Sequence, residues 1–342
     1  MKKKLLLVFV SILVISLLTG CGGAKKDPAP AAAPKPIKII AAHNQTSPDN
    51  PYQVGLLKFK EVAESKSKGQ ITVEVHAGTL GTNENELVEK LKLRAVDLVV
   101  VSPGFMTQTG VKEVDLLALP YMFDSYAHWM KVIDGDVGKQ LADMINKKSN
   151  NDFKIVGYWS AGVRHYYGKK PLNSMADLKD MKIRTQTSGV IGDFWKGLGA
   201  IPTSVSWGEL YQALQQKTVD GAENAYPYFV QQNHHKTENG KYTTEIGADF
   251  TTRLLLVNGK KFDTMTKEQQ AIILEAAKAS VEAERASVIA QEKEYKEKAI
   301  KDGAVVNTID RKPFIAVALP IQDKFAKSIG AEEIVKKIRE TK

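Results

Sequence analysis

The chain has 342 residues and a formal net charge of +9, from 48 Lys and Arg against 39 Asp and Glu, and it contains a single cysteine. One cysteine excludes an intramolecular disulfide framework, so the fold must depend on its apolar core. The basic residues are dispersed among acidic ones and form no concentrated block, which argues against a nucleic-acid-binding protein.

The first twenty residues have the pattern of an export signal. Lysines at positions 2–4 precede an apolar stretch from 5 to 15 that contains one polar residue, Ser11, and Leu18-Thr-Gly20 stand directly before Cys21. A helix over residues 5–18 would be only about 21 Å long, short of the ~30 Å hydrocarbon core of a bilayer. We therefore expect residues 1–20 to be a signal peptide and not a stable transmembrane anchor.

The segment after the signal predicts a lipid anchor and a tether. Leu18-Thr-Gly-Cys21 resembles the lipobox of bacterial lipoproteins, in which the cysteine is lipidated and becomes the first residue of the mature chain. The alternative is a chance cysteine in a discarded signal. Residues 21–36 lack large apolar side chains and are rich in Pro and Ala, which predicts a flexible tether.

The folded body begins near Ile37 with strands that alternate with helical patterns. Such alternation predicts an open, mostly parallel sheet covered on both faces, with ligands at the carboxyl ends of the strands. The predicted strands are Ile37–Ala42, Ile71–His76 and Leu98–Val101, and the predicted helices are Tyr52–Ser65 and Asn85–Leu93.

A second group of strands and helices follows, and the body is about twice the usual domain size, so we expect two lobes. An apolar strand at Arg253–Asn258 comes after this group, which predicts that the chain returns to the first lobe. The predicted elements of the second group are strands at Phe153–Trp159, Arg164–Gly168 and Lys182–Arg184, and helices at Val190–Leu198 and Trp207–Gln216.

One long helix is expected near the C-terminus. Thr266-Lys-Glu-Gln269 matches a capping box, and no helix breaker follows before Gly303. A helix over Lys267–Lys301 would be about 52 Å long, enough to run past both lobes. The alternative is a dimerising coiled coil, but its apolar positions are mostly Ala and never settle into a sustained heptad of large residues.

Six short motifs occur in a fixed order along the body, and with them the chain resembles the DctP-type solute-binding proteins of TRAP (tripartite ATP-independent periplasmic) transporters. The motifs are Leu80-Gly81 with Asn85-Glu-Leu87, Leu119-Pro-Tyr121, Gly162-Val-Arg164, Ala176-Asp-Leu-Lys179 leading to Lys182-Ile-Arg184, Leu210-Tyr-Gln-Ala-Leu214, and Val219-Asp-Gly-Ala-Glu-Asn224.

The resemblance implies an α/β fold, a two-lobed periplasmic-binding-protein clamshell with hinge strands and a long helix spanning both lobes. It also implies closure on a small organic acid, which is handed to the small and large membrane subunits of a TRAP permease. The lobes would comprise residues 37–161 plus 250–288 and residues 162–249 plus 289–342.

The resemblance assigns the main ligand-holding arginine to Arg184, a second anchor to Arg164, and a polar contact to Asn224. The residues around Arg184 favour the same role, because it ends a strand beside a predicted helix N-terminus and its planar guanidinium can grip a carboxylate with two bonds. The alternative is a salt-bridged structural arginine. We expect the Arg184 side chain to be solvated in the empty protein.

Other candidates have structural alternatives of similar weight. Arg164 stands beside His165-Tyr-Tyr167 and could belong to an aromatic stack, and Asn224 could satisfy a local turn. Some relatives carry an acidic residue facing the ligand where this chain has Ser102, which puts recognition of a cationic or amino-sugar group in doubt. The remaining predicted ligand contacts are Trp207, which could be core, His43 and Asn44 at a strand end, Gln186 after Arg184, and Tyr226 after Asn224.

No catalytic or cofactor constellation is evident. His234 and His235 are adjacent and cannot share a helix face, so no metal site is expected there, and neither a Gly-rich phosphate loop nor a Gly-x-Ser-x-Gly elbow occurs. A hydrolase or lyase would need such a set, and a scaffold or adhesion lipoprotein would show repeats or a large apolar patch. We therefore expect a monomeric, lipid-anchored extracytoplasmic receptor without a cofactor. As its ligand, a sugar acid such as a uronate is slightly favoured over a C4-dicarboxylate.

Overall fold

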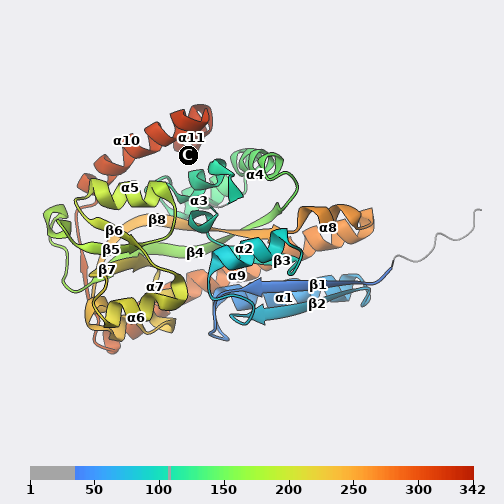
Figure 1. Ribbon diagram of the computed structural model, residues 1–342, viewed down its shortest axis with the longest axis horizontal. Coiled ribbons are helices and arrows are strands. Elements are labelled where there is room, and N and C mark those ends of the chain that lie inside the picture. Colours follow the sequence, from blue (N-terminus) through green and yellow to red (C-terminus); the bar gives the residue numbers. More distant parts are fainter. Residues whose placement is uncertain (1–34, 107–108) are drawn as a thin grey trace, which may run out of the picture. The chain divides into compact units, whose positions relative to one another are not determined.

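The computed structural model describes residues 35–106 and 109–342, and Lys35–Lys342 form one compact unit (Figure 1). The predicted signal peptide, the lipidation at Cys21 and all but the end of the tether lie outside the described residues. Within the described part of the chain, no helix is long and apolar enough to span a bilayer.

The first half of the sheet has the predicted strand–helix alternation. β1 pairs in parallel with both β2 and β3, so the carboxyl ends of the three strands lie at the same edge. Asn50 and Asn83 begin the two helices, because each side chain accepts a backbone N–H of the first turn. The elements are β1 (Ile37–His43), α1 (Pro51–Lys66), β2 (Ile71–Ala77), α2 (Glu84–Lys92) and β3 (Leu98–Val101).

The second half repeats this arrangement with β5 between β6 and β7, again parallel. The helix predicted at 207–216 begins as a 3₁₀ turn, η5 (Trp207–Glu209), and becomes α-helical only from Leu210. The other elements are β5 (Lys182–Thr185), α5 (Gly189–Gly197), β6 (Ile201–Ser204), α6 (Leu210–Gln215), β7 (Gly221–Asn224) and α7 (Tyr226–Gln231).

Two long antiparallel strands, β4 (Lys154–Gly168) and β8 (Tyr242–Val257), join the halves into one sheet of order β2-β1-β3-β8-β4-β7-β5-β6 (Figure 1). The prediction of separate strands at 153–159 and 164–168 is wrong. An irregularity between Ser160 and Val163, with Gly162 at φ 75°, interrupts the pattern without ending the strand. The sheet is thus parallel within each half and antiparallel in the middle.

The return of the chain to the first half is confirmed. β8 pairs with β3 through Leu254–Val257, and it begins eleven residues before the predicted start at Arg253, at Tyr242. Its early part also pairs with β9 (Val305–Thr308). β8 therefore carries residues of both halves on one continuous backbone.

The predicted long helix is confirmed as α9 (Lys267–Lys301), with the capping box between Thr266 and Gln269. It packs within the chain against α1 in the first half, β4 in the centre and α7 in the second half. Glu284 and Glu292 accept hydrogen bonds from the backbone N–H groups of Ser160 and Val163, both 3.0 Å long. α9 thus holds the irregular stretch of β4.

Except for α8, which lies at the right-hand side of Figure 1, the remaining helices lie above the sheet in that view. α10 packs against α5, whereas α11 packs against α4, and Val335 and Ile338 of α11 share a core cluster with Leu141 of α4. These helices are α3 (Tyr126–Ile133), α4 (Asp136–Lys148), α8 (Gly259–Thr264), α10 (Lys312–Ile329) and α11 (Glu332–Glu340), and the 3₁₀ turns include η1 (Pro103–Phe105) and η3 (Lys112–Ala118).

Candidate ligand-binding site

A cavity lies where the carboxyl ends of strands from both halves meet. Arg184 is the penultimate residue of β5 and Asn224 ends β7 in the second half, while Ser102 follows β3 and Gln45 follows β1 in the first half. The cavity is lined by Gln45, Glu84, Ser102, Phe105, Arg164, Arg184, Gln186, Trp207, Asn224, Tyr228 and Arg253. Arg184, Arg164, Asn224, Trp207 and Gln186 are thus brought together, as predicted from the sequence.

Arg184 is buried, with 1% of its surface exposed, so the expectation of a solvated side chain is wrong. Its guanidinium carbon lies 5.8 Å from the ring centroids of both Phe105, in the first half, and Trp207, in the second half. Residues from both halves therefore cover it. Its Nε donates to the Val205 carbonyl at 2.9 Å. Burial lowers the pKa of Arg184 to about 10, which leaves it cationic at neutral pH.

The positive charge of Arg184 has no counter-ion in the described structure. Whereas Arg164 and Arg285 pair with carboxylates, Arg184 forms no ion pair with a described residue, and its Nη2 has no hydrogen-bond partner among them. A buried cation without a paired anion is strongly unfavourable. The cavity is therefore electrostatically prepared for an anionic group.

Arg164 is held differently. Its Nε and Nη2 both donate to the Glu223 carboxylate, with the Nη2 bond 2.8 Å long, and its Nη1 donates to Asn224 Oδ1 at 3.2 Å. Asn224 also accepts the N–H of Ala225 at 2.9 Å, so the turn role and a cavity position coexist. Arg164 thus lines the cavity with its charge already compensated by Glu223.

Five buried polar atoms of the residues lining this cavity have no hydrogen-bond partner among the described residues. They are Arg184 Nη2, Trp207 Nε1, Ser102 Oγ, Gln45 Oε1 and the hydroxyl of Tyr228. A buried donor or acceptor without a partner destabilises the folded protein by about 1–3 kcal/mol. Two N–H donors, two hydroxyls and an amide acceptor in one cavity can bind a carboxylate and hydroxyl groups together.

Three predicted residues lie outside this lining and support its neighbours. The imidazole of His43 contacts Gln53 at 2.8 Å and accepts the Gln45 N–H at 3.1 Å, and burial lowers the His43 pKa to about 4. Asn44 Oδ1 accepts from Gln45 Nε2 at 2.9 Å, so both residues orient Gln45. Tyr226 instead donates to Glu245 at 2.9 Å on another surface of the second half.

Sequence reasoning missed Gln45, Glu84 and Arg253. Glu84 accepts the Ser102 N–H at 2.6 Å, so a carboxylate lines the cavity although Ser102 itself is not acidic. Arg253 donates to the Tyr52 hydroxyl, and although burial opposes its charge, Tyr52 and Glu84 raise its pKa above the ordinary value. A lone arginine in the apolar run of β8 is the signal that could have identified it.

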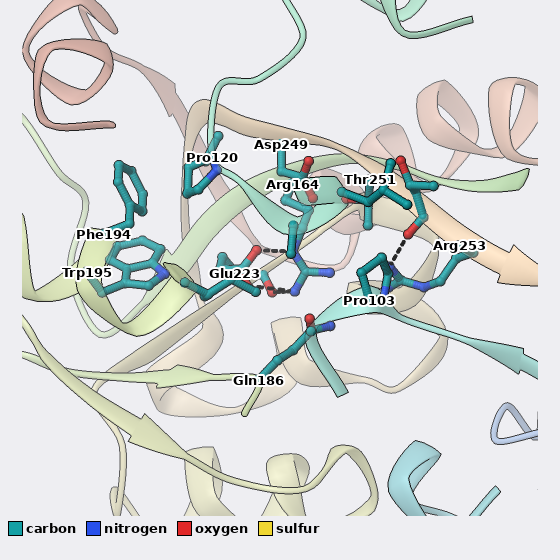
Figure 2. Close-up of a pocket in the computed structure, with 16 residues that line it drawn as sticks. Pro103, Pro120, Arg164, Gln186, Phe194, Trp195, Glu223, Asp249, Thr251 and Arg253 are labelled. Carbon is teal, nitrogen blue, oxygen red and sulfur yellow. Dashed lines mark hydrogen bonds and ion pairs between the residues drawn. The ribbon is translucent and has the colours of Figure 1, made fainter. Parts of the chain in front are cut away.

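A second cavity adjoins the first and shares Arg164, Gln186 and Arg253 with it. Figure 2 shows the Arg164–Glu223 pair in its middle, Phe194 and Trp195 on one side and Arg253 on the other. Asp249 lies beside Arg164 on the neighbouring strand, and burial raises the Asp249 pKa to about 6. The two cavities therefore meet around one buried charge pair between the halves.

The chain matches a protein-family model over most of its length. The model of the DctP family, bacterial extracellular solute-binding protein family 7, matches residues 41–328. The chain belongs to this family. Proteins similar to it include the C4-dicarboxylate-binding periplasmic protein DctP of Rhodobacter capsulatus, 28% identical over 94% of this chain and 96% of that protein, and the uncharacterized protein YiiZ of Salmonella typhimurium, 34% identical over 84% and 86%.

Solved TRAP periplasmic solute-binding proteins have the same fold as this family 7 chain. A Sulfitobacter protein with bound β-D-galacturonate is 28% identical with a TM-score of 0.83, covering 89% of this chain and 99% of that one. A Pseudomonas putida protein with bound D-glucuronate is 29% identical with a TM-score of 0.84, covering 89% and 97%. The protein is a solute-binding protein of the TRAP type with the two-lobed α/β fold.

Proposed function

We propose that this protein binds a sugar acid of the uronate class, holds its carboxylate at Arg184, and delivers it to the small and large membrane subunits of a TRAP permease. The observation that carries the proposal is the buried Arg184 guanidinium, which has no ion pair with a described residue and shares its cavity with four other unpartnered polar groups. Solved relatives with bound galacturonate and glucuronate support the ligand class.

The neutral polar groups favour a hydroxylated monocarboxylate over a C4-dicarboxylate. Gln45, Ser102 and Asn224 present amide and hydroxyl groups that suit sugar hydroxyls. The carboxylate of Glu84 also lines the cavity and would disfavour a second anionic group beside it. The dicarboxylate remains the second candidate because the Rhodobacter capsulatus relative binds C4-dicarboxylates.

Calorimetric titration with D-glucuronate, D-galacturonate, succinate and L-malate separates these candidates. We expect a uronate to bind at least tenfold more tightly than either dicarboxylate, a difference of about 1.4 kcal/mol. Chromatography should recover the bound acid unchanged, since a receptor does not turn its ligand over. Binding of succinate or malate in preference to both uronates would replace the proposed ligand with the second candidate, and chemical conversion of the acid would contradict a receptor.

A lipid anchor at Cys21 is part of the proposed function, because a tethered receptor stays near its permease. The lipobox-like Leu18-Thr-Gly-Cys21 is the supporting observation. Mass spectrometry of membrane-extracted protein should detect a mature chain that begins at a diacylated Cys21 and has lost residues 1–20. A mature chain that retains Met1 and carries an unmodified Cys21 would contradict this prediction.

The proposed lobes are residues 37–161 plus 250–288 and residues 162–249 plus 289–342, acting as a monomer. β4 and β8 run through both halves and would act as hinge strands, while α9 contacts α1 on one side and α7 on the other. A ligand that prefers the closed form shifts the open–closed equilibrium by its difference in affinity for the two forms. Bound acid would thus bring the halves together over Arg184.

A further inference from the structure

The turn η1 is the point at which the first half reaches across the cavity to the second. It follows β3, and it faces the segment that connects β5 to α5. Thr187 Oγ1 donates a hydrogen bond to the Gly104 carbonyl at 2.9 Å, and the ring of Phe105 lies 5.8 Å from the Arg184 guanidinium carbon. Backbone and side-chain contacts of η1 thus both fall on residues adjoining the proposed carboxylate site.

Gly104 is the tightest part of this contact. A Cβ atom built at Gly104 would lie 2.1 Å from Gln186 Oε1, 3.2 Å from Gln186 Cβ and 3.0 Å from Ile191 Cδ1. The Gln186 amide could rotate away, but its Cβ and the Ile191 side chain would still crowd the added methyl group. Gly104 has no positive φ value, so its backbone conformation by itself does not require glycine.

We propose that Gly104 is a positioning residue for solute binding: because it lacks a side chain, η1 can close against Gln186 and Ile191 and place Phe105 over Arg184. This inference rests on the proposed anion site at Arg184 and goes beyond it, since Gly104 offers the ligand no side chain. An alanine at this position crowds only the form in which the halves meet. It therefore raises the free energy of the closed form relative to the open one and lowers the apparent affinity.

The test compares Gly104→Ala with Gly192→Ala. Gly192 lies in α5, close in sequence to Ile191, and a Cβ built there has no atom within 4 Å, so it is a matched control. Calorimetry uses whichever of D-glucuronate and succinate the wild-type protein binds, which keeps a wrong ligand class distinct from a wrong closure mechanism. We expect about tenfold weaker binding for Gly104→Ala and less than twofold change for Gly192→Ala.

Two further measurements separate closure from a general loss of stability. The melting temperature of ligand-free Gly104→Ala should match that of the wild type, and small-angle scattering at saturating ligand should show less compaction than in the wild type. The double variant Gly104→Ala/Ile191→Val removes the Ile191 Cδ1 atom, which lies 3.0 Å from the new methyl group, and should recover part of the lost affinity. Wild-type affinity and full compaction in Gly104→Ala would overturn the inference, as would an equal loss in Gly192→Ala or no recovery in the double variant.

Discussion

Arg184→Ala is expected to abolish measurable solute binding, and Arg184→Lys is expected to retain the charge but lose most of the affinity. Arg184 is a buried cation of the cavity that has no ion pair with a described residue and an Nη2 without a hydrogen-bond partner among them, so a bound carboxylate supplies the missing partner. Lysine is a point donor and cannot reproduce a two-bond grip. Losing one charge-assisted hydrogen bond weakens the binding free energy by about 1.5–3 kcal/mol, which lowers the affinity roughly ten- to hundredfold.

The melting temperatures of the same variants distinguish binding from a structural role. Removing Arg184 takes away a buried, unpaired charge, so ligand-free Arg184→Ala should melt no lower than the wild type. Arg164→Ala leaves the Glu223 carboxylate buried and unpaired, and it should lose about 3–5 kcal/mol of stability. Arg339→Lys in α11, which pairs with Asp323 and is not among the residues lining the cavity, is the control and should leave binding unchanged. Wild-type affinity in Arg184→Lys, or a collapsed melting temperature in Arg184→Ala, would contradict the proposed role.

Glu284→Gln is expected to stabilise the protein at pH 8 and to leave its stability almost unchanged at pH 5. Glu284 lies on α9 with none of its surface exposed, and burial raises its pKa to about 8, against the opposing effects of the Ser160 N–H, Arg285 and Arg253. The buried phenols of Tyr52 and Tyr228 also face it. Burial favours the protonated carboxyl over the carboxylate. At a pH at which the carboxyl would ionise, a neutral amide at this position therefore gives a more stable folded protein.

The sign of the pH dependence follows from the raised pKa. A carboxyl whose folded pKa exceeds its unfolded value of 4.5 contributes stability that is fully present below pH 4.5 and is lost as the pH rises through about 8. Glutamine keeps an oxygen for the Ser160 N–H and does not titrate. The advantage of Glu284→Gln over the wild type should therefore grow from pH 5 to pH 8 and reach a few kcal/mol, on the order of 1.4 kcal/mol per unit of pKa shift.

Urea unfolding of both proteins at a series of pH values measures this difference directly. The unfolding free energies of the two proteins must be compared at each pH, because other buried groups also change stability with pH. Burial lowers the pKa values of His43 and His165 to about 4, and their titration affects both proteins equally. Glu282→Gln, at an exposed position of the same helix, is the control and should show no growing advantage. A pH-independent difference between Glu284→Gln and the wild type would contradict a neutral carboxyl at this position.

Local signals in the sequence were sufficient for most individual elements. The bounds of α9 follow from a capping box and the absence of a breaker, and β1, β3 and α1 follow from apolar runs bounded by turn and cap residues. Arg184 could be chosen as the ligand-holding residue because its motif and its place at a strand end coincide. Each of these signals involves residues that are close together along the chain.

The tertiary structure alone decided the rest. In the sequence, the residues around Gly162 predict the end of a strand. Only the pairing with β8 and the hydrogen bonds to α9 show that β4 continues through them. Gln45, Glu84 and Arg253 converge on one cavity from distant segments, so no local pattern connects them. Arg184 is buried because η1 from the other half covers it. Burial and desolvation depend on which distant surfaces meet, and that is set by long-range packing and not by the order of neighbouring residues.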